Sequence, residues 1–106
     1  MPTFDGSEGR QIPTAEAAGY TSQFRTDYRN NKKAYFVGVD NINALIGQNG
    51  TMGFRIYLGI KNIDGVNQIM PILVSADEDG EDIIGICIDD MCPCPNMCST
   101  NSPLMK

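Results

Sequence analysis

Four cysteines near the C-terminal end have the clearest chemical potential. They follow the spacing C-x4-C-x-C-x3-C and are Cys87, Cys92, Cys94 and Cys98. Four thiolates can close a tetrahedral zinc site. However, this spacing lacks the usual pair of CxxC knuckles, and Pro93 and Pro95 remove N–H groups that would stabilise thiolates. Four cysteines also allow three disulfide connectivities. We favour disulfides without the strained Cys92–Cys94 pair, with reduced structural thiols and zinc as alternatives.

Two clusters of charge could also bind ions. The first cluster is acidic, and residues 77–82 read DEDGED. If Gly80 is placed at the sixth position of an EF-hand calcium loop, the twelfth position is Ile86. The twelfth position of that loop must be a carboxylate that binds calcium, so the EF-hand pattern does not match. We therefore expect a solvated turn, with a different calcium site as the alternative. The second cluster is basic and comprises Arg25, Arg29, Lys32 and Lys33. One interpretation is that these cations interact favourably with the dipole at the C-terminus of a helix. The more specific interpretation is that the four residues form a binding site for an anion.

Several classes of function have no support in the sequence. The chain has no histidine. This absence excludes Ser-His-Asp and Cys-His catalytic sites and metal sites with histidine ligands. A small enzyme would have to use carboxylates such as Asp77, Asp79 and Asp82, or a cysteine nucleophile. No GxGxxG or P-loop pattern occurs, and no small-molecule ligand can be identified. We expect no resident cofactor, zinc being the alternative.

Charge and hydropathy limit the partners and the compartment. The net charge is −5, with +2 over residues 1–61 and −7 over residues 62–106, so nucleic acid is not an expected partner. The sequence has no run of about 18 apolar residues, so we expect no membrane-spanning helix. The N-terminal sequence lacks the basic and apolar regions of a secretory signal, so we expect a cytoplasmic protein. Disulfide-bonded cysteines would instead suit an extracellular or cell-surface location.

The stretch that must organise these groups runs from Gly53 to Asp77. Phe54, Ile56, Leu58 and Ile60 alternate with Arg55, Tyr57, Gly59 and Lys61, a period of two that is typical of a strand. Asp64-Gly65 is a strong turn signal, and the chain returns over residues 68–76. We predict a β-hairpin whose apolar face is the floor of the core. Pro71 predicts an edge position or a bulge in its second strand.

The remaining elements are predicted from shorter signals. A helix is expected over about residues 15–30, with Thr14 as its N-cap. One face of this helix carries an aromatic stripe that we expect to pack against the sheet. The stripe consists of Ala17, Tyr20, Thr21, Phe24 and Tyr28. Residues 34–39 read as a strand covered on both faces. A short helix follows, capped by Asp40 and burying Ile42, Leu45 and Ile46. It ends at Gly50, and the last strand covers residues 83–88.

Some of these segments resemble a known group of sequences. The segments are Gly9-Arg10-Gln11-Ile12-Pro13, Glu16-Ala17-Ala18, Tyr28-Arg29, residues 34–38, residues 53–59 and Cys92-Pro93-Cys94-Pro95. Over most of its length the chain is similar to small hypothetical proteins from Bacteroidetes-type bacteria. The shared motifs are of the kind that shape a fold, and the resemblance implies no activity and no site residue.

The sequence thus predicts an α+β protein. We expect an antiparallel sheet of three to four strands with two helices on one face over residues 12–90, an N-terminal arm over residues 1–11 and a Cys/Pro-rich C-terminal arm over residues 91–106. The preferred function is non-enzymatic. It is a small structural or interaction protein that associates with itself through its arms, into a filament or another homo-oligomer. A zinc-binding module and a small enzyme are the alternatives.

Overall fold

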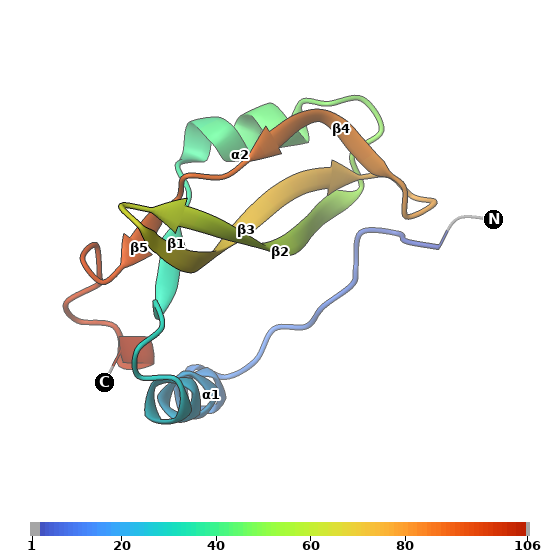
Figure 1. Ribbon diagram of the computed structural model, residues 1–106. Helices are drawn as coiled ribbons and strands as arrows, with labels where there is room; N and C mark the ends of the chain where they lie inside the picture. Colours follow the sequence, from blue (N-terminus) through green and yellow to red (C-terminus); the bar gives the residue numbers. More distant parts are fainter. Residues whose placement is uncertain (1–2, 106) are drawn as a thin grey trace. The chain divides into compact units, whose positions relative to one another are not determined.

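The computed structural model describes residues 3–105, and these form two compact units (Figure 1). Unit 1 contains the chain up to Gly9 together with Val37–Met91, and unit 2 contains Arg10–Phe36 and the chain from Cys92 onward. Residues 12–36, predicted to share one domain with the hairpin, therefore belong to a different unit. Residues 1, 2 and 106 of the predicted arms lie outside the described residues.

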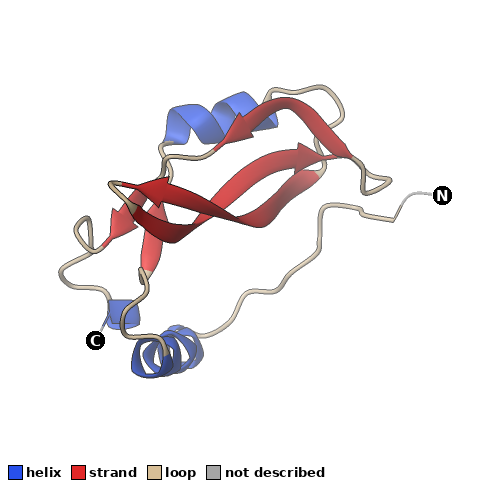
Figure 2. Ribbon diagram, viewed as in Figure 1, coloured by secondary structure: helices blue, strands red, loops and turns tan. Residues whose placement is uncertain are grey.

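Unit 1 is a three-stranded antiparallel sheet with one short helix (Figure 2). Its elements are α2 (Val39–Ile46), β2 (Gly53–Ile63), β3 (Val66–Ala76) and β4 (Asp82–Ile88). The strand order is β2-β3-β4, which places β2 at an edge, and α2 contacts β3 and β4. Two helices and an antiparallel sheet of three strands confirm the predicted α+β class.

The predicted hairpin is confirmed. Its strands pair from Gly53↔Ala76 to Ile63↔Val66. The two turn residues, Asp64 and Gly65, have φ angles of 53° and 86°. Positive φ at both positions defines a type I′ turn, whose twist matches that of the flanking strands. The side chain of Asn62 accepts a hydrogen bond from the Gly65 N–H at 3.1 Å and so fixes the turn.

Pro71 lies where the sheet needs no hydrogen bond from it. It pairs with Leu58 on β2, while the last residue of β4 in the ladder, Ile88, faces Leu73. Pro71 is therefore beyond the paired part of β4, at a point where β3 has a strand neighbour on one side. This agrees with the rule that proline occupies sheet positions without a ladder donor.

The core of unit 1 is centred on the second half of β3 and on Leu45 of α2. Leu45 and Ser75 are completely buried. The Ser75 hydroxyl donates to the Leu45 carbonyl at 2.8 Å and accepts from the Gln48 amide at 3.1 Å. The other buried side chains of the unit are Met70, Leu73, Val74, Ala76 and Met91. The buried hydroxyl thus joins the end of α2 to the sheet.

The prediction that the apolar face of β2 forms the core floor is wrong. Phe54 is 40% exposed, and the three following residues of that face, Ile56, Leu58 and Ile60, are more exposed still. The period of two shows which side chains share a face, but not what covers that face. Here α2 has eight residues and reaches the sheet at Ser75, so it covers only one end of this face.

The second helix differs from its prediction in its cap and its buried side. Its N-cap is Gly38, and Asp40 lies in the first turn, where a carboxylate suits the helix dipole. Leu45 is buried as predicted, whereas Ile46 is exposed. The helix ends at Ile46 with Gly47 as its C-cap, before the predicted end at Gly50. Gly50 has a φ of 88°, in the left-handed region that favours glycine, and lies in the loop that follows.

Unit 2 joins two segments that are distant in the sequence. Its elements are α1 (Thr14–Asp27), β1 (Ala34–Phe36), β5 (Cys92–Cys94) and η1 (Pro103–Met105). β1 and β5 pair antiparallel, with Tyr35 opposite Pro93, and α1 packs against η1. Among the described residues, no helix has the length and apolar character needed to cross a membrane.

Three predictions for unit 2 are corrected. The N-cap of α1 is Pro13, not Thr14. Tyr20 and Tyr28 are more than half exposed, so the aromatic stripe is not a buried core face. The strand predicted over residues 34–39 has only three residues, and Phe36 is exposed, because within residues 3–105 β1 pairs only with the equally short β5.

Candidate functional site

The cysteines do not act as one group in the structure. Cys94 and Cys98 form a disulfide with a Cα–Cα distance of 4.8 Å, within the usual range. Cys87 on β4 and Cys92 on β5 are free, exposed thiols. This pairing avoids the Cys92–Cys94 bond, as predicted. Among residues 3–105, no group of three or more His, Cys, Asp or Glu side chains is placed to hold a metal ion. Zinc binding by the reduced tail stays a prediction.

The acidic segment forms the turn between β3 and β4. The Asp77 carboxylate accepts hydrogen bonds from the N–H groups of Asp79 and Glu81, at 2.9 and 3.0 Å. Gly80, with a φ of 85°, closes the turn, and a side chain there would also meet the Phe4 ring at 3.0 Å. The carboxylate of Asp77 thus holds its own loop, as in the Asx turns that aspartate favours.

Asp82 belongs to a polar cluster on the sheet. Its carboxylate accepts hydrogen bonds from the Tyr57 hydroxyl and from the Arg55 guanidinium, which also donates to the Gly80 carbonyl at 2.9 Å. The hydrogen bond from Tyr57, followed by that from Arg55, lowers the pKa of Asp82 below its ordinary value of 3.8. The same bond raises the pKa of Tyr57 above 10.0. These groups satisfy one another, an arrangement that stabilises a fold.

The N-terminal arm docks on this cluster. The N–H groups of Thr3 and Phe4 donate to the Glu78 carbonyl at 2.7 and 2.9 Å. The Phe4 ring centroid lies 6.0 Å from the Arg55 guanidinium, within reach of a cation–π contact. The sequence offered no signal for this docking, because a single phenylalanine in a polar segment has no periodic pattern.

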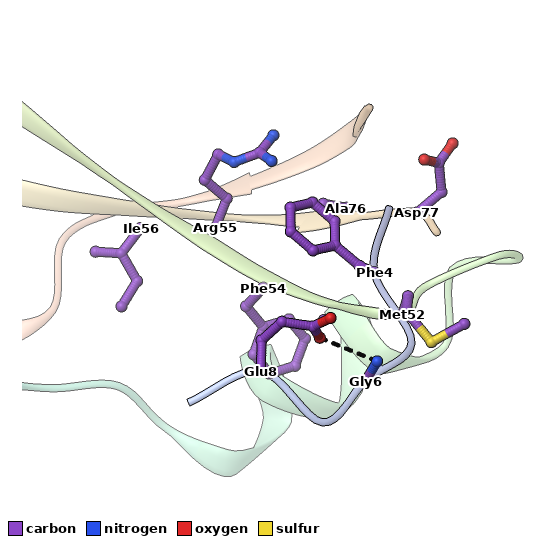
Figure 3. A pocket seen from close by; sticks show the side chains of 10 residues that line it. Phe4, Gly6, Glu8, Met52, Phe54, Arg55, Ile56, Ala76 and Asp77 are labelled. Atoms are coloured by element: carbon purple, nitrogen blue, oxygen red, sulfur yellow. Dashed lines mark hydrogen bonds between the residues drawn. The ribbon is translucent and has the colours of Figure 1, made fainter. Parts of the chain in front are cut away.

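A pocket of about 380 Å³ lies between this arm and the start of β2 (Figure 3). Phe4, Gly6 and Glu8 line it from the arm, and Met52–Ile56 and Ala76-Asp77 line it from the sheet. Figure 3 shows Arg55 projecting to the opposite side of β2 from Phe54 and Ile56. The carboxylate of Glu8 accepts from the Gly6 N–H at 3.0 Å. Arg55 is engaged by Asp82, and the Asp77 carboxylate by the N–H groups of its own turn, so none of the three charged side chains is held ready for a ligand.

The basic residues of the predicted anion patch all lie in unit 2. Arg25 donates to the Leu104 carbonyl, and Lys32 to the Pro95 carbonyl at 3.1 Å. Lys33 donates to the carbonyls of Arg29 and Asn31, each at 2.6 Å. These contacts fasten the end of α1 and the C-terminal segment. Anion binding by Arg25, Arg29, Lys32 and Lys33 stays a prediction.

The feature with the greatest binding capacity is an apolar surface on the hairpin. Four side chains on one face of β2 and β3, which we call the hairpin patch, are Ile56 (63% exposed), Leu58 (79%), Ile60 (76%) and Ile69 (51%). Ile60 pairs directly with Ile69, so the four are contiguous. Contiguous exposed apolar side chains mark interaction surfaces more often than chance exposure does. Sequence periodicity found three of these residues but assigned them to the core.

Comparisons with known proteins add no relative. No protein-family model, no curated protein and no solved structure matches this chain.

Proposed function

We propose that this protein is a non-enzymatic structural or interaction protein that associates with itself. The observation that carries the proposal is the hairpin patch, which presents four large aliphatic side chains to solvent. Burying one such side chain contributes roughly 1.5–3 kcal/mol, so covering all four would stabilise an assembly substantially.

The position of β2 strengthens the proposal. β2 has eleven residues and lies at the edge of the sheet, and among the described residues its strand partner is β3 alone. Long apolar edge strands are sites where further chains add, unless charge, proline or a bulge blocks them. β2 contains no proline, and its charged side chains Arg55 and Lys61 point to the face opposite the patch. Nothing on the patch face of β2 therefore opposes association.

The terminal arms, by contrast, are held within the chain. The N-terminal arm is docked on Glu78 and Arg55. The C-terminal segment pairs with β1, contains the Cys94–Cys98 bond and packs η1 on α1. We therefore assign self-association to the hairpin patch rather than to the arms.

The proposal is tested by light scattering coupled to size-exclusion chromatography over a range of protein concentrations. We expect the wild-type mass to rise with concentration. Leu58→Glu should weaken association by about tenfold to a hundredfold, because it places a charge where the assembly would bury an apolar side chain. Ile84→Glu is the matched control, since Ile84 is 74% exposed but lies on β4, outside the patch. A wild-type protein that stays monomeric at every concentration contradicts the proposal.

A further inference from the structure

We infer that the hairpin patch of one copy receives the α1 face of unit 2 from a second copy, so that the chains join head to tail. This inference rests on the proposed self-association and names the surfaces that meet. The α1 face is defined by the exposed rings of Tyr20, Phe24 and Tyr28 together with the neighbouring basic residues Arg25, Arg29, Lys32 and Lys33.

The two surfaces match in apolar character and in length. Tyr20, Phe24 and Tyr28 follow one another at four-residue intervals, so their Cα atoms span about 12 Å along the helix. Ile56, Leu58 and Ile60 follow at two-residue intervals and span about 13 Å along the strand. The rings of Phe24 and Tyr28 are already stacked, with centroids 5.1 Å apart, which reduces the entropy lost on docking.

Charge favours this pairing over contact between like units. Unit 1 carries eleven acidic and two basic residues, a net charge of −9. Unit 2 carries six basic and two acidic residues, a net charge of +4. Two hairpin patches placed face to face would bring two strongly acidic units together. A hairpin patch against an α1 face brings opposite charges together, which speeds encounter and selects the partner.

A contact between two different surfaces has a consequence for the assembly. A row of copies has a free hairpin patch at one end and a free α1 face at the other. The row therefore grows unless rotation between successive copies closes it into a ring. We therefore expect masses beyond a dimer at high concentration. We also expect the association to weaken as salt rises from about 0.02 M to about 0.5 M, since the Debye length falls from about 20 Å to about 4 Å.

Mixing two variants tests the inference. Leu58→Glu removes the hairpin patch and keeps the α1 face. The double variant Tyr28→Glu/Arg29→Glu removes the α1 face and keeps the hairpin patch; both residues are exposed, and the main-chain cap contact of Tyr28 is retained. At the lowest concentration at which the wild-type protein associates, each variant alone should be a monomer. Mixed in equal amounts, they should form a dimer that grows no further, because each copy retains one working surface.

The outcomes separate this inference from the proposed function. A monomeric wild-type protein overturns both. If the wild-type protein associates but the mixture stays monomeric, or if Tyr28→Glu/Arg29→Glu associates like the wild type, the head-to-tail contact is wrong and self-association stands. Circular dichroism establishes that each variant is folded. Ile60→Glu, at a residue 76% exposed, replaces Leu58→Glu if that variant is not folded, and the wild-type salt series is an independent readout.

Discussion

Replacing Leu45 by alanine tests the joint between α2 and the sheet, which defines the core of unit 1. Leu45 is completely buried, and its carbonyl accepts hydrogen bonds from Ser75 and from Thr51, at 2.8 and 3.1 Å. The substitution leaves the main chain and these bonds in place. It removes only side-chain atoms and leaves a cavity.

The expected loss is large relative to the stability of a domain this small. Truncation of a buried leucine costs about 2–5 kcal/mol, whereas small domains have unfolding free energies of about 5–15 kcal/mol. Ile46→Ala is the matched control, because Ile46 is the next residue of α2 and is 56% exposed. Its loss should stay under about 1 kcal/mol, and the gain in helix propensity is similar in both variants.

Urea unfolding followed by circular dichroism measures both free energies. With a slope of about 1–3 kcal/mol per molar urea, a loss of about 3 kcal/mol lowers the midpoint by roughly 1–3 M. We expect Leu45→Ala to show this shift at an unchanged slope. If Leu45→Ala and Ile46→Ala lose the same free energy within about 0.5 kcal/mol, α2 does not anchor the core and the assignment of the buried face is wrong.

Two further predictions concern titration and thiol chemistry. Because hydrogen bonds from Tyr57 and Arg55 lower the pKa of Asp82, its stabilising contribution is present above the ordinary value of 3.8 and is lost as the pH falls through the lower folded value. The urea midpoints of wild type and Asp82→Asn should therefore differ at neutral pH and approach each other as the pH falls below 3.8, and a constant difference would contradict this reasoning. Without reductant, alkylation followed by mass spectrometry should label Cys87 and Cys92 but not the Cys94–Cys98 pair, and reduction should expose all four thiols.

The hairpin was the most predictable part of the fold. Strict alternation over Phe54–Lys61 and the Asp64-Gly65 turn are local signals, and both act within a few residues. The structure shows the turn with positive φ at both residues, as the sequence chemistry requires. The strand predicted from Ile83 to Ile88 is β4, which begins one residue earlier, at Asp82. It is not the last strand as predicted, because β5 follows it.

The coverage of these elements was not predictable in the same way. Alternation along β2 shows that Ile56 and Leu58 lie on the same face of the strand. Which element covers that face depends on the tertiary structure, and alternation does not reveal it. A helix of eight residues that contacts Ser75 is too short to cover the strand. The same limit applies to the aromatic stripe of α1, which the sequence predicts to pack in the core. Periodicity shows that these side chains share one face of the helix, but not which element packs against that face.

The pairing of β1 with β5 had no signal in the sequence. Each strand has three residues, they are far apart in the chain, and β5 contains Pro93. Likewise, four cysteines allow three connectivities of two disulfides, whereas the structure has the single bond Cys94–Cys98, which only the fold selects. Among the candidate sites, the acidic turn was expected, whereas the roles of Phe4 and Tyr57 depend on contacts between distant residues.

The most direct test of the account is a measurement between two differently labelled copies. One copy carries serine at positions 87 and 92 and a spin label at Gln23→Cys, beside the α1 face. The other copy is isotope-labelled and carries no spin label. Head-to-tail association should broaden the amide signals of Ile56, Leu58 and Ile60 in the isotope-labelled copy and leave that of Ile84 unchanged. Unchanged signals over the hairpin patch, or broadening confined to α1 of the isotope-labelled copy, would contradict it.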